Sequence, residues 1–244
     1  MPGRAKAAVL TEALDRLEAR YGKLVPSDDP VEAGILTLLA MHASKLSNSQ
    51  SRDRLRDAFV DWNEMRSADP WDVTTALEAG GDPEALAFAR AALRFLESIN
   101  AILHRTALDS LKADPLADPA VTIDKMRGAP PPVKAVVLTV LDATGAWHPG
   151  AEMIKLLQRL GVIGKTASAA KAGKEAQEAA GSEDRLRAHY LLTRYACREK
   201  EEEDPLADLG GGKKAAKASP KKPSEKKPAA GGKAAKPKAA APKE

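Results

Sequence analysis

The sequence predicts an all-α domain followed by a disordered basic C-terminal tail, and three observations predict this architecture. Four of the Asp-Pro pairs in residues 1–210 precede an expected helix, at Asp29-Pro30, Asp69-Pro70, Asp82-Pro83 and Asp118-Pro119. Each pair is typical of a helix start, because aspartate accepts hydrogen bonds from first-turn amides and proline at the first helical position has no amide to leave unpaired. No segment shows the period-two alternation of a strand. From Gly211 onward the branched and aromatic apolar residues that a core needs are missing.

The expected helices follow these start signals along the chain. Glu32 and Asp72 lie three residues after their caps, where a carboxylate can bind back to the cap amide and strengthen the start. Gly80-Gly81 and Gly161 are typical of helix ends. After Asp82, apolar residues keep helical spacing through one long helix, at Leu86, Ala89, Leu93, Leu96 and Leu103. Further helices are expected over residues 7–21, 31–46, 50–62, 133–144, 150–160, 168–180 and 183–200.

Length and composition divide the 244 residues into three parts. We predict an N-terminal helix in residues 1–26, a helical domain in residues 27–210 and the tail in residues 211–244. Hydrophobic residues make up 43% of the chain but aromatic ones only 4%, so aliphatic side chains must fill the core. No apolar stretch is long enough for a membrane span, and the basic start of the chain lacks the apolar block of a signal peptide. We therefore expect a cytoplasmic monomer with no membrane partner.

The charge is distributed unevenly between the domain and the tail. Residues 211–244 hold 11 Lys and 2 Glu and carry +9, which leaves 27 basic and 32 acidic side chains and −5 for residues 1–210. Such a tail predicts nonspecific, salt-sensitive attraction to DNA and a place on the nucleoid, and the alternative is a solubilising segment. It resembles the tails of linker histones and of some bacterial DNA-binding proteins. The candidate DNA-binding lysines are Lys213, Lys214, Lys217, Lys221, Lys222, Lys226, Lys227, Lys233, Lys236 and Lys238.

Four segments of the domain resemble the endonuclease III family of helix-hairpin-helix DNA glycosylases, in order and spacing. They are Val31 to Leu55, residues 126–161, Arg194-Tyr195-Ala196-Cys197, and Asp204-Pro205-Leu206-Ala207-Asp208-Leu209. The resemblance covers roughly residues 27 to 210 and implies an endonuclease III-like domain with a helix-hairpin-helix remnant. The chain looks like a degenerate member that lacks the catalytic and iron–sulfur residues. A coincidental helical bundle is the alternative.

The hairpin of this family binds a DNA phosphate through backbone amides, and the matching residues here are Met126, Arg127, Gly128, Ala129 and Pro130. The three consecutive prolines 130–132 have no amide to donate. Gly128 can still form the turn and stays a candidate DNA contact. A hairpin kept for structure, with most of its phosphate site lost, is therefore expected.

The resemblance implies a catalytic lysine and a catalytic aspartate, and this chain has Pro132 and Gly150 at those positions. Lys134 is two residues further on, which rotates a side chain by roughly 200° on a helix, so we expect a solvated lysine that points away. Asp142, His148 and Glu152 are the nearest groups that could substitute. Nothing near His148 in the sequence orients it, so a surface or capping role is expected. We therefore predict no catalytic residues at the family positions.

The family's iron–sulfur cluster needs four cysteine thiolates. Only Cys197 remains, and the other three positions are Asp204, Ala207 and Lys213. One thiolate cannot hold a cluster, so no iron–sulfur cluster, other cofactor or metal is expected. Cys197 cannot form an intramolecular disulfide, suits a reducing cytoplasm, and is expected to be a small buried helix residue.

Three further residues are candidate DNA contacts in the domain. His42 stands where the family has a glutamine that fills the gap left by an extruded base, and Arg52 and Arg56 follow it. Because Asp53 and Asp57 interleave with the arginines, a mixed-charge exposed helix is the alternative. The remaining histidines, His104 and His189, show no ligand spacing and are expected to be ordinary helix residues. The three tryptophans, Trp62, Trp71 and Trp147, are expected to anchor helix packing.

The sequence thus predicts a DNA-associated, catalytically inactive protein of the base-excision repair superfamily. One alternative is an active, divergent DNA glycosylase or AP lyase that uses Asp142, His148 or Glu152. A second alternative is a protein-interaction scaffold for which the tail is incidental. Extrusion of a base costs a few kcal/mol and needs a gripped backbone and a fitted pocket, so the joint loss of hairpin amides, lysine, aspartate and cluster favours the inactive protein.

Overall fold

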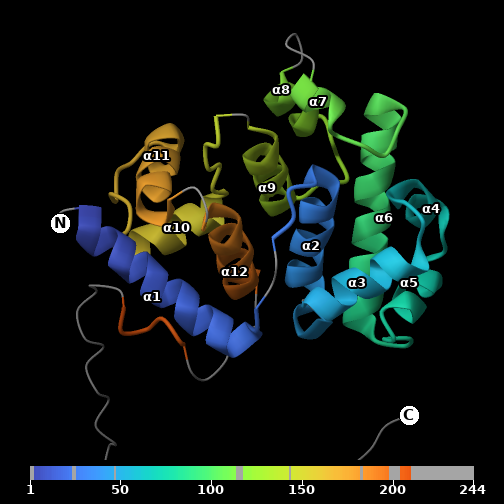
Figure 1. The fold of residues 1–244 in the computed structure, drawn as a ribbon, viewed down its shortest axis with the longest axis horizontal. Helices are drawn as coiled ribbons and strands as arrows, with labels where there is room; N and C mark the ends of the chain where they lie inside the picture. The colour runs from blue at the N-terminus through green and yellow to red at the C-terminus, as the bar shows by residue number, and fades with distance from the viewer. Residues whose placement is uncertain are drawn as a thin grey trace, which may run out of the picture. The chain divides into compact units, whose positions relative to one another are not determined.

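A computed structural model describes residues 3–23, 26–46, 48–113, 118–142, 144–181, 184–197 and 204–209. Within these ranges the protein is helical and contains no strand, which confirms the predicted all-α class (Figure 1). The chain divides into two units, residues 1–212 and 213–244. The second unit lies outside the described residues. No helix in the described part of the chain is both long and apolar enough to cross a membrane.

The helices follow one another without intervening sheets. Their bounds are Gly3–Tyr21 (α1), Pro30–His42 (α2), Ser44–Leu46 (η1, a 3-10 helix), Ser49–Ala58 (α3), Trp62–Ser67 (α4), Pro70–Ala76 (α5), Pro83–Leu103 (α6), Ser110–Ala113 (α7), Pro119–Asp124 (α8), Pro131–Leu141 (α9), Ala151–Arg159 (α10), Ala169–Ala180 (α11) and Arg185–Cys197 (α12). Gly161 ends α10 with a φ of +74°, a left-handed conformation that favours glycine.

The four Asp-Pro helix starts are confirmed. Asp29, Asp69, Asp82 and Asp118 each cap a helix and accept at least one first-turn amide, with proline at the start of the helix. The Asp69 amide donates in return to the Asp72 carboxylate, which completes a capping box. The expected helix over residues 50–62 instead ends at Ala58, because Asp61 caps a separate helix, α4, by accepting the Glu64 amide at 2.8 Å.

The larger core lies among helices α2 to α9. Aliphatic and phenylalanine side chains fill it, including Phe88 and Phe95 of α6 and Leu38 of α2, all fully buried. Gly34 permits the close approach of α2 to α6, since a Cβ at this position would lie 2.6 Å from the Phe95 ring. These contacts fix α6 and α9 on either side of α2.

A second core joins the two ends of the domain. Leu10, Leu14 and Leu17 of α1 are buried with side chains of α10, α11 and α12, and Leu36 and Ala40 of α2 contribute to the same cluster. Figure 1 shows α1 beside α12, although more than 160 residues separate them. The N-terminal helix is therefore part of the same packed body, and α2 contributes to both cores.

Several exposures differ from the sequence-based expectations. Trp147 is buried as expected, at 2% exposure, and Trp62 packs partly against the larger core. Trp71 is 53% exposed, so the prediction that it anchors packing is wrong. Cys197 is also exposed at the end of α12, which corrects the expectation of a buried thiol. Its neighbours from residue 198 to 203 lie outside the described residues.

Candidate nucleic-acid interface and reactive positions

The turn between α8 and α9 lies at the residues that were predicted to form the hairpin. Its backbone is closed by hydrogen bonds from the Met126 amide to the Ile123 carbonyl at 3.1 Å and from the Ala129 amide to the Met126 carbonyl at 3.2 Å. Pro130 is the N-cap of α9, and Pro131 and Pro132 are its first helical residues. A helix needs no amide at these positions. Because proline has no backbone N–H, none of the three residues can donate an amide hydrogen bond to an anion.

Gly128 is required by a close approach of backbones. A Cβ on this residue would lie 2.1 Å from the Arg94 carbonyl oxygen of α6, a distance that side chains never tolerate. Its φ is outside the left-handed region, so the expected role in forming the turn is not the reason for the glycine. Gly128 holds the α8–α9 turn directly against α6.

A basic group that the sequence analysis missed lies around this contact. Arg94 and Arg90 are four residues apart on the exposed side of α6, and Arg127 is exposed next to Gly128. None of the three arginines forms an ion pair within the described residues. Burial lowers the pKa of His42, and the positive charge of Arg94 lowers it further, so the two side chains are near each other. The spacing of four on a helix was a signal for this group, but Glu97, three residues after Arg94, suggested an ion pair, and the structure pairs Glu97 with Arg66 at 2.7 Å instead.

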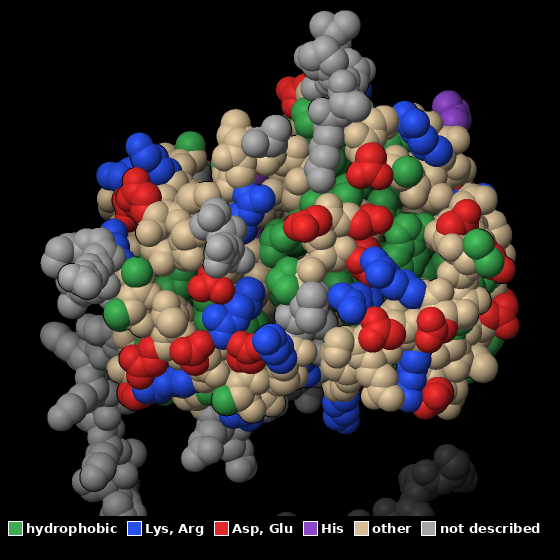
Figure 2. Space-filling view, viewed as in Figure 1, with side chains coloured by type: hydrophobic (Ala, Val, Ile, Leu, Met, Phe, Trp, Pro, Cys, Tyr) green, Lys and Arg blue, Asp and Glu red, His purple; other side chains and the backbone are tan. Residues whose placement is uncertain are grey.

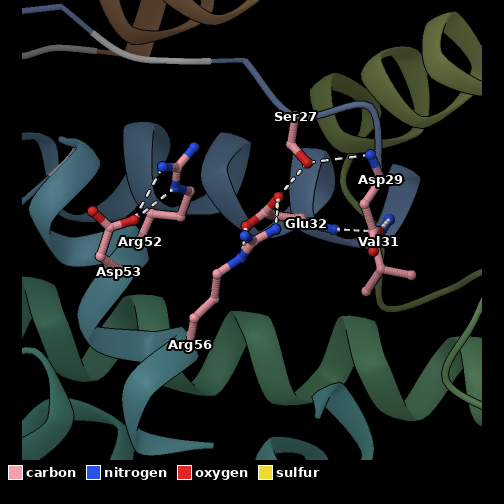
Figure 3. Close-up of polar contacts among 7 residues, drawn as sticks. All are labelled: Ser27, Asp29, Val31, Glu32, Arg52, Asp53 and Arg56. Carbon is pink, nitrogen blue, oxygen red and sulfur yellow. Dashed lines mark hydrogen bonds and ion pairs between the residues drawn. The ribbon is translucent and has the colours of Figure 1, made fainter. Parts of the chain in front are cut away.

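Arg52 and Arg56 are held in ion pairs. The Arg56 guanidinium lies 2.6 Å and 2.7 Å from the two carboxylate oxygens of Glu32, which is 1% exposed and also accepts from the Ser27 hydroxyl (Figure 3). Arg52 donates to Asp53 at 3.0 Å and 3.1 Å. The sequence suggested that Glu32 completes a capping box with Asp29. This prediction is wrong, because the Glu32 carboxylate binds Arg56 and Ser27 instead.

The residues of the domain that were predicted to contact DNA do not all lie together in the structure. Glu32, the partner of Arg56, and His42 lie ten residues apart on α2, which is about 15 Å along the helix. Gly128 and His42 instead share Arg94 as a neighbour. Figure 2 shows acidic and basic side chains interspersed over the face that it views, as expected for a domain in which many cations are paired with carboxylates. The ten candidate lysines of the tail lie outside the described residues.

Pro132 and Gly150, the positions that the resemblance assigned to catalysis, line one cavity of about 220 Å³. Gly150 caps α10 without a side-chain hydrogen bond. Of the described residues that line this cavity, Glu152 is the one carboxylate and none is a lysine. Lys134 does not line it, because its ammonium donates to the Asp124 carbonyl at 2.6 Å on another side of α9. Cys197 contributes to the cavity wall.

His189 lies fully buried beneath Pro132 and was not identified from the sequence. The Trp147 indole, which can only donate, lies 3.4 Å from His189 Nδ1. Nδ1 therefore accepts, and Nε2 carries the proton and donates to the Pro132 carbonyl at 3.2 Å. Burial lowers the pKa of His189 to about 4, although the bond to Pro132 opposes this shift. His189 is a neutral core residue that connects α12, α9 and the segment before α10.

His148 is oriented by Asp142, which corrects the expectation that nothing orients it. His148 Nε2 lies 2.7 Å from Asp142 Oδ2, and the His148 amide donates to the Thr139 hydroxyl at 3.0 Å. The other Asp142 oxygen accepts from the amide and hydroxyl of Thr144 at 2.8 Å and 2.5 Å. Burial opposes ionisation of Asp142, but the hydrogen bonds from Thr144 and His148 outweigh it and lower its pKa. The carboxylate thus fixes the orientation of the imidazole through Nε2.

The segment that would carry the iron–sulfur cluster in the resembling family is held by side-chain contacts. Asp204 accepts from the Tyr195 hydroxyl at 2.5 Å and from the Leu206 amide at 3.0 Å, and lies 3.5 Å from Arg159. Lys213, at another of the cluster positions, lies outside the described residues. Among the described side chains, no three of His, Cys, Asp or Glu are grouped as metal ligands.

Comparison with protein-family models finds no match for this chain, and a search of curated proteins also finds none. The resemblance to the endonuclease III family therefore stays a hypothesis that depends on the residues quoted for it.

Proposed function

We propose that the protein is a cytoplasmic, nucleoid-associated DNA-binding protein of the endonuclease III superfamily that has lost glycosylase chemistry. The observation that carries the proposal is the separation of charge: residues 211–244 carry +9 and residues 1–210 carry −5. Clustered lysines release the counterions of the phosphate backbone when they bind, so the tail supplies affinity without sequence preference.

The pairing of cations in the domain supports the dominant role of the tail. Arg56, Arg66 and Arg187 are held by carboxylates at 2.6 to 2.8 Å. A paired arginine must exchange its partner for a phosphate, so it gains less on binding than a free lysine. The exposed group of Arg90, Arg94 and Arg127 is the part of the domain that best complements a phosphate.

The loss of catalysis is supported by the residues of the Pro132 cavity. Pro132 has no amine that could form a Schiff base with a sugar, and Gly150 has no carboxylate. The three prolines that start α9 also remove the amides of the hairpin. The domain is accordingly proposed to act without an iron–sulfur cluster or another cofactor and to contribute orientation on DNA.

Duplex binding measured over a range of salt concentrations tests the proposal. If about five tail lysines contact phosphates, the logarithm of the affinity falls with the logarithm of salt concentration with a slope of about −4.5. Replacing the eleven tail lysines with glutamine should make the dependence shallower, with a slope between about −1 and zero. Charge reversal at Lys155, which is paired with Glu152 at 2.6 Å on α10, is the control and should leave the slope unchanged.

Two results would overturn this proposal. Affinity that does not depend on salt and persists in the lysine-free tail variant would show that the domain alone binds DNA. A full-length protein without any duplex affinity, but with a protein partner, would favour the scaffold instead.

A divergent DNA glycosylase or AP lyase is the second candidate, and the His148–Asp142 pair favours it. A histidine held by a carboxylate can act as a general base. Incubation with oligonucleotides that carry oxidised, deaminated or mismatched bases should give base release or strand nicking, and Asp142→Asn should reduce it by about 100-fold or more. No turnover at high protein concentration would eliminate this candidate.

A further inference from the structure

A hollow of the domain lies between α9 and α11, on the other side of Pro131 from the Pro132 cavity. It has a volume of about 890 Å³, within the range of small-molecule sites. Figure 1 shows the two helices on either side of the segment that joins α9 to α10. Each helix lines the cavity with positions spaced as one helical face, at Pro131, Lys134, Ala135 and Leu138 of α9 and at Ala170, Gly173, Lys174 and Gln177 of α11.

The back of the cavity is rigid and mostly apolar. Residues 146–149 form it, and the Trp147 indole is held by its bond to His189. Gly173 packs against the Trp147 carbonyl so closely that a Cβ would lie 2.7 Å from the oxygen. This contact holds α11 at a fixed distance from the segment. The spacing between α11 and this wall of the cavity is therefore set by a backbone contact.

The polar groups of the cavity include two without partners. Gln177 Oε1 is a buried acceptor without a hydrogen bond, which is costly unless a ligand or water supplies a donor. His148 Nδ1 is the second, since Asp142 binds Nε2 on the other side of the ring and Nδ1 has no hydrogen bond among the described residues. Lys174 is an exposed cation without an ion pair in the described residues. Lys134, which is bound to Asp124, provides a second ammonium on the opposite wall.

We propose that this cavity binds a small organic anion with an apolar body and a hydrogen-bond donor. The apolar body lies against Leu138, Ala146 and Pro149, the anionic group lies beside Lys174, and the donor binds Gln177 Oε1. Lys174 and Gln177 are three residues apart on α11, so one ligand can contact both. This binding is independent of DNA association and uses neither the tail nor the Arg90 group.

Fluorescence titration of the full-length protein with anilinonaphthalene sulfonate tests the proposal. This probe combines two aromatic ring systems, a sulfonate and an aniline N–H, and it becomes fluorescent on leaving water. Phenylnaphthylamine is the matched neutral probe, with the same rings and N–H but no sulfonate. We expect saturable binding of one sulfonate probe per protein, and binding of the neutral probe that is weaker by about fivefold, the contribution of one exposed ion pair.

Variants on α11 locate the site. Ala170→Trp fills the cavity from an exposed position and should weaken probe binding by about tenfold or more, the effect of overfilling a binding pocket, whereas Ala58→Trp on α3 is the control for added bulk. Lys174→Gln should weaken binding by about fivefold. Lys171→Gln on the same helix is the charge control, since Lys171 does not line the cavity and lies 3.9 Å from Glu175.

The control variants distinguish a change in the cavity from a general effect of the substitution on folding. Equal binding by Ala170→Trp, Ala58→Trp and the unmodified protein would overturn the site. Equal binding of the charged and neutral probes, or equal effects of Lys174→Gln and Lys171→Gln, would overturn the preference for an anion. Circular dichroism confirms that each variant is folded, because loosened proteins also bind this probe. A variant that is unfolded is replaced by Gln177→Leu, for which about threefold weaker binding is expected.

Discussion

His189 makes the domain sensitive to mild acid. Its ring is fully buried between Trp147 and the Pro132 carbonyl, and burial lowers its pKa from 6.5 to about 4. In the unfolded chain the ring binds a proton below pH of about 6.5, whereas the folded protein keeps it neutral until about pH 4. Its contribution to stability is therefore complete above pH of about 6.5 and is lost as the pH falls toward 4.

The size of this loss follows from the two pKa values. A difference of one pKa unit corresponds to about 1.4 kcal/mol, so the full shift of His189 corresponds to about 3 kcal/mol. Between pH 8 and pH 5 about 2 kcal/mol of this is lost. The lowered pKa of His42 acts in the same direction. Carboxylates with lowered pKa values, such as Asp142, lose their contribution only below about pH 4.

Urea unfolding at pH 8 and pH 5 measures the effect. We expect the free energy of unfolding to fall by about 2 kcal/mol or more in the unmodified protein. His189→Gln keeps an amide donor and a carbonyl acceptor but does not titrate, so its stability should change by less than about 1 kcal/mol over the same range. His42→Gln is the control and should keep most of the loss, because His42 is only partly buried.

One result would refute this reasoning. If His189→Gln loses as much stability as the unmodified protein between pH 8 and pH 5, the acid sensitivity comes from other groups. A flat profile for His42→Gln together with a steep one for His189→Gln would assign the effect to His42 instead.

Two further predictions concern contacts that chemical denaturation can measure. Gly128→Ala should destabilise the domain by about 3 kcal/mol, because its Cβ would collide with the Arg94 carbonyl, whereas Gly80→Ala, with nothing within 4 Å, should change stability by less than about 0.5 kcal/mol. Equal effects would contradict the close approach. Arg56→Met should cost about 3 kcal/mol by leaving the buried Glu32 carboxylate without its cation, whereas Glu32→Gln should cost about 1 kcal/mol, because Arg56 can turn to water. The reverse order would contradict the burial of Glu32.

The helix starts could be predicted from sequence because their physics is local. Asp69 and Asp82 bind amides two residues away, so the residues that decide the structure are adjacent in the sequence. The end of α3 was missed because Asp61 was not recognised as a cap without a following proline. Asp29 shows the limit of a local pattern: its cap is correct, but the carboxylate expected to complete the box is taken by Arg56, 24 residues away.

The polar contacts around α9 could not be predicted, because the residues that meet are far apart in the sequence or are not related by a helical or strand period. His189 and Pro132 are 57 residues apart, and no spacing connects them. Arg94 and Gly128 meet through backbone atoms, which leave no signal other than a glycine. Asp142 and His148 are only six residues apart, yet the segment between them is irregular, so no helical or strand period indicated that their side chains would meet.

The three prolines before Val133 connect the stability of α9 to the proposed mode of DNA binding. They lower the conformational entropy of the unfolded chain at the residues that become the first turn of α9. At these positions they remove no helical hydrogen bond. The same absence of amides removes the directional contacts by which a helix start holds a phosphate. If the chain binds DNA as proposed, its affinity must therefore come from charged side chains, which act over longer distances and without fixed geometry. Such affinity depends steeply on salt and only weakly on sequence, so competition between duplexes of different sequence should show little preference.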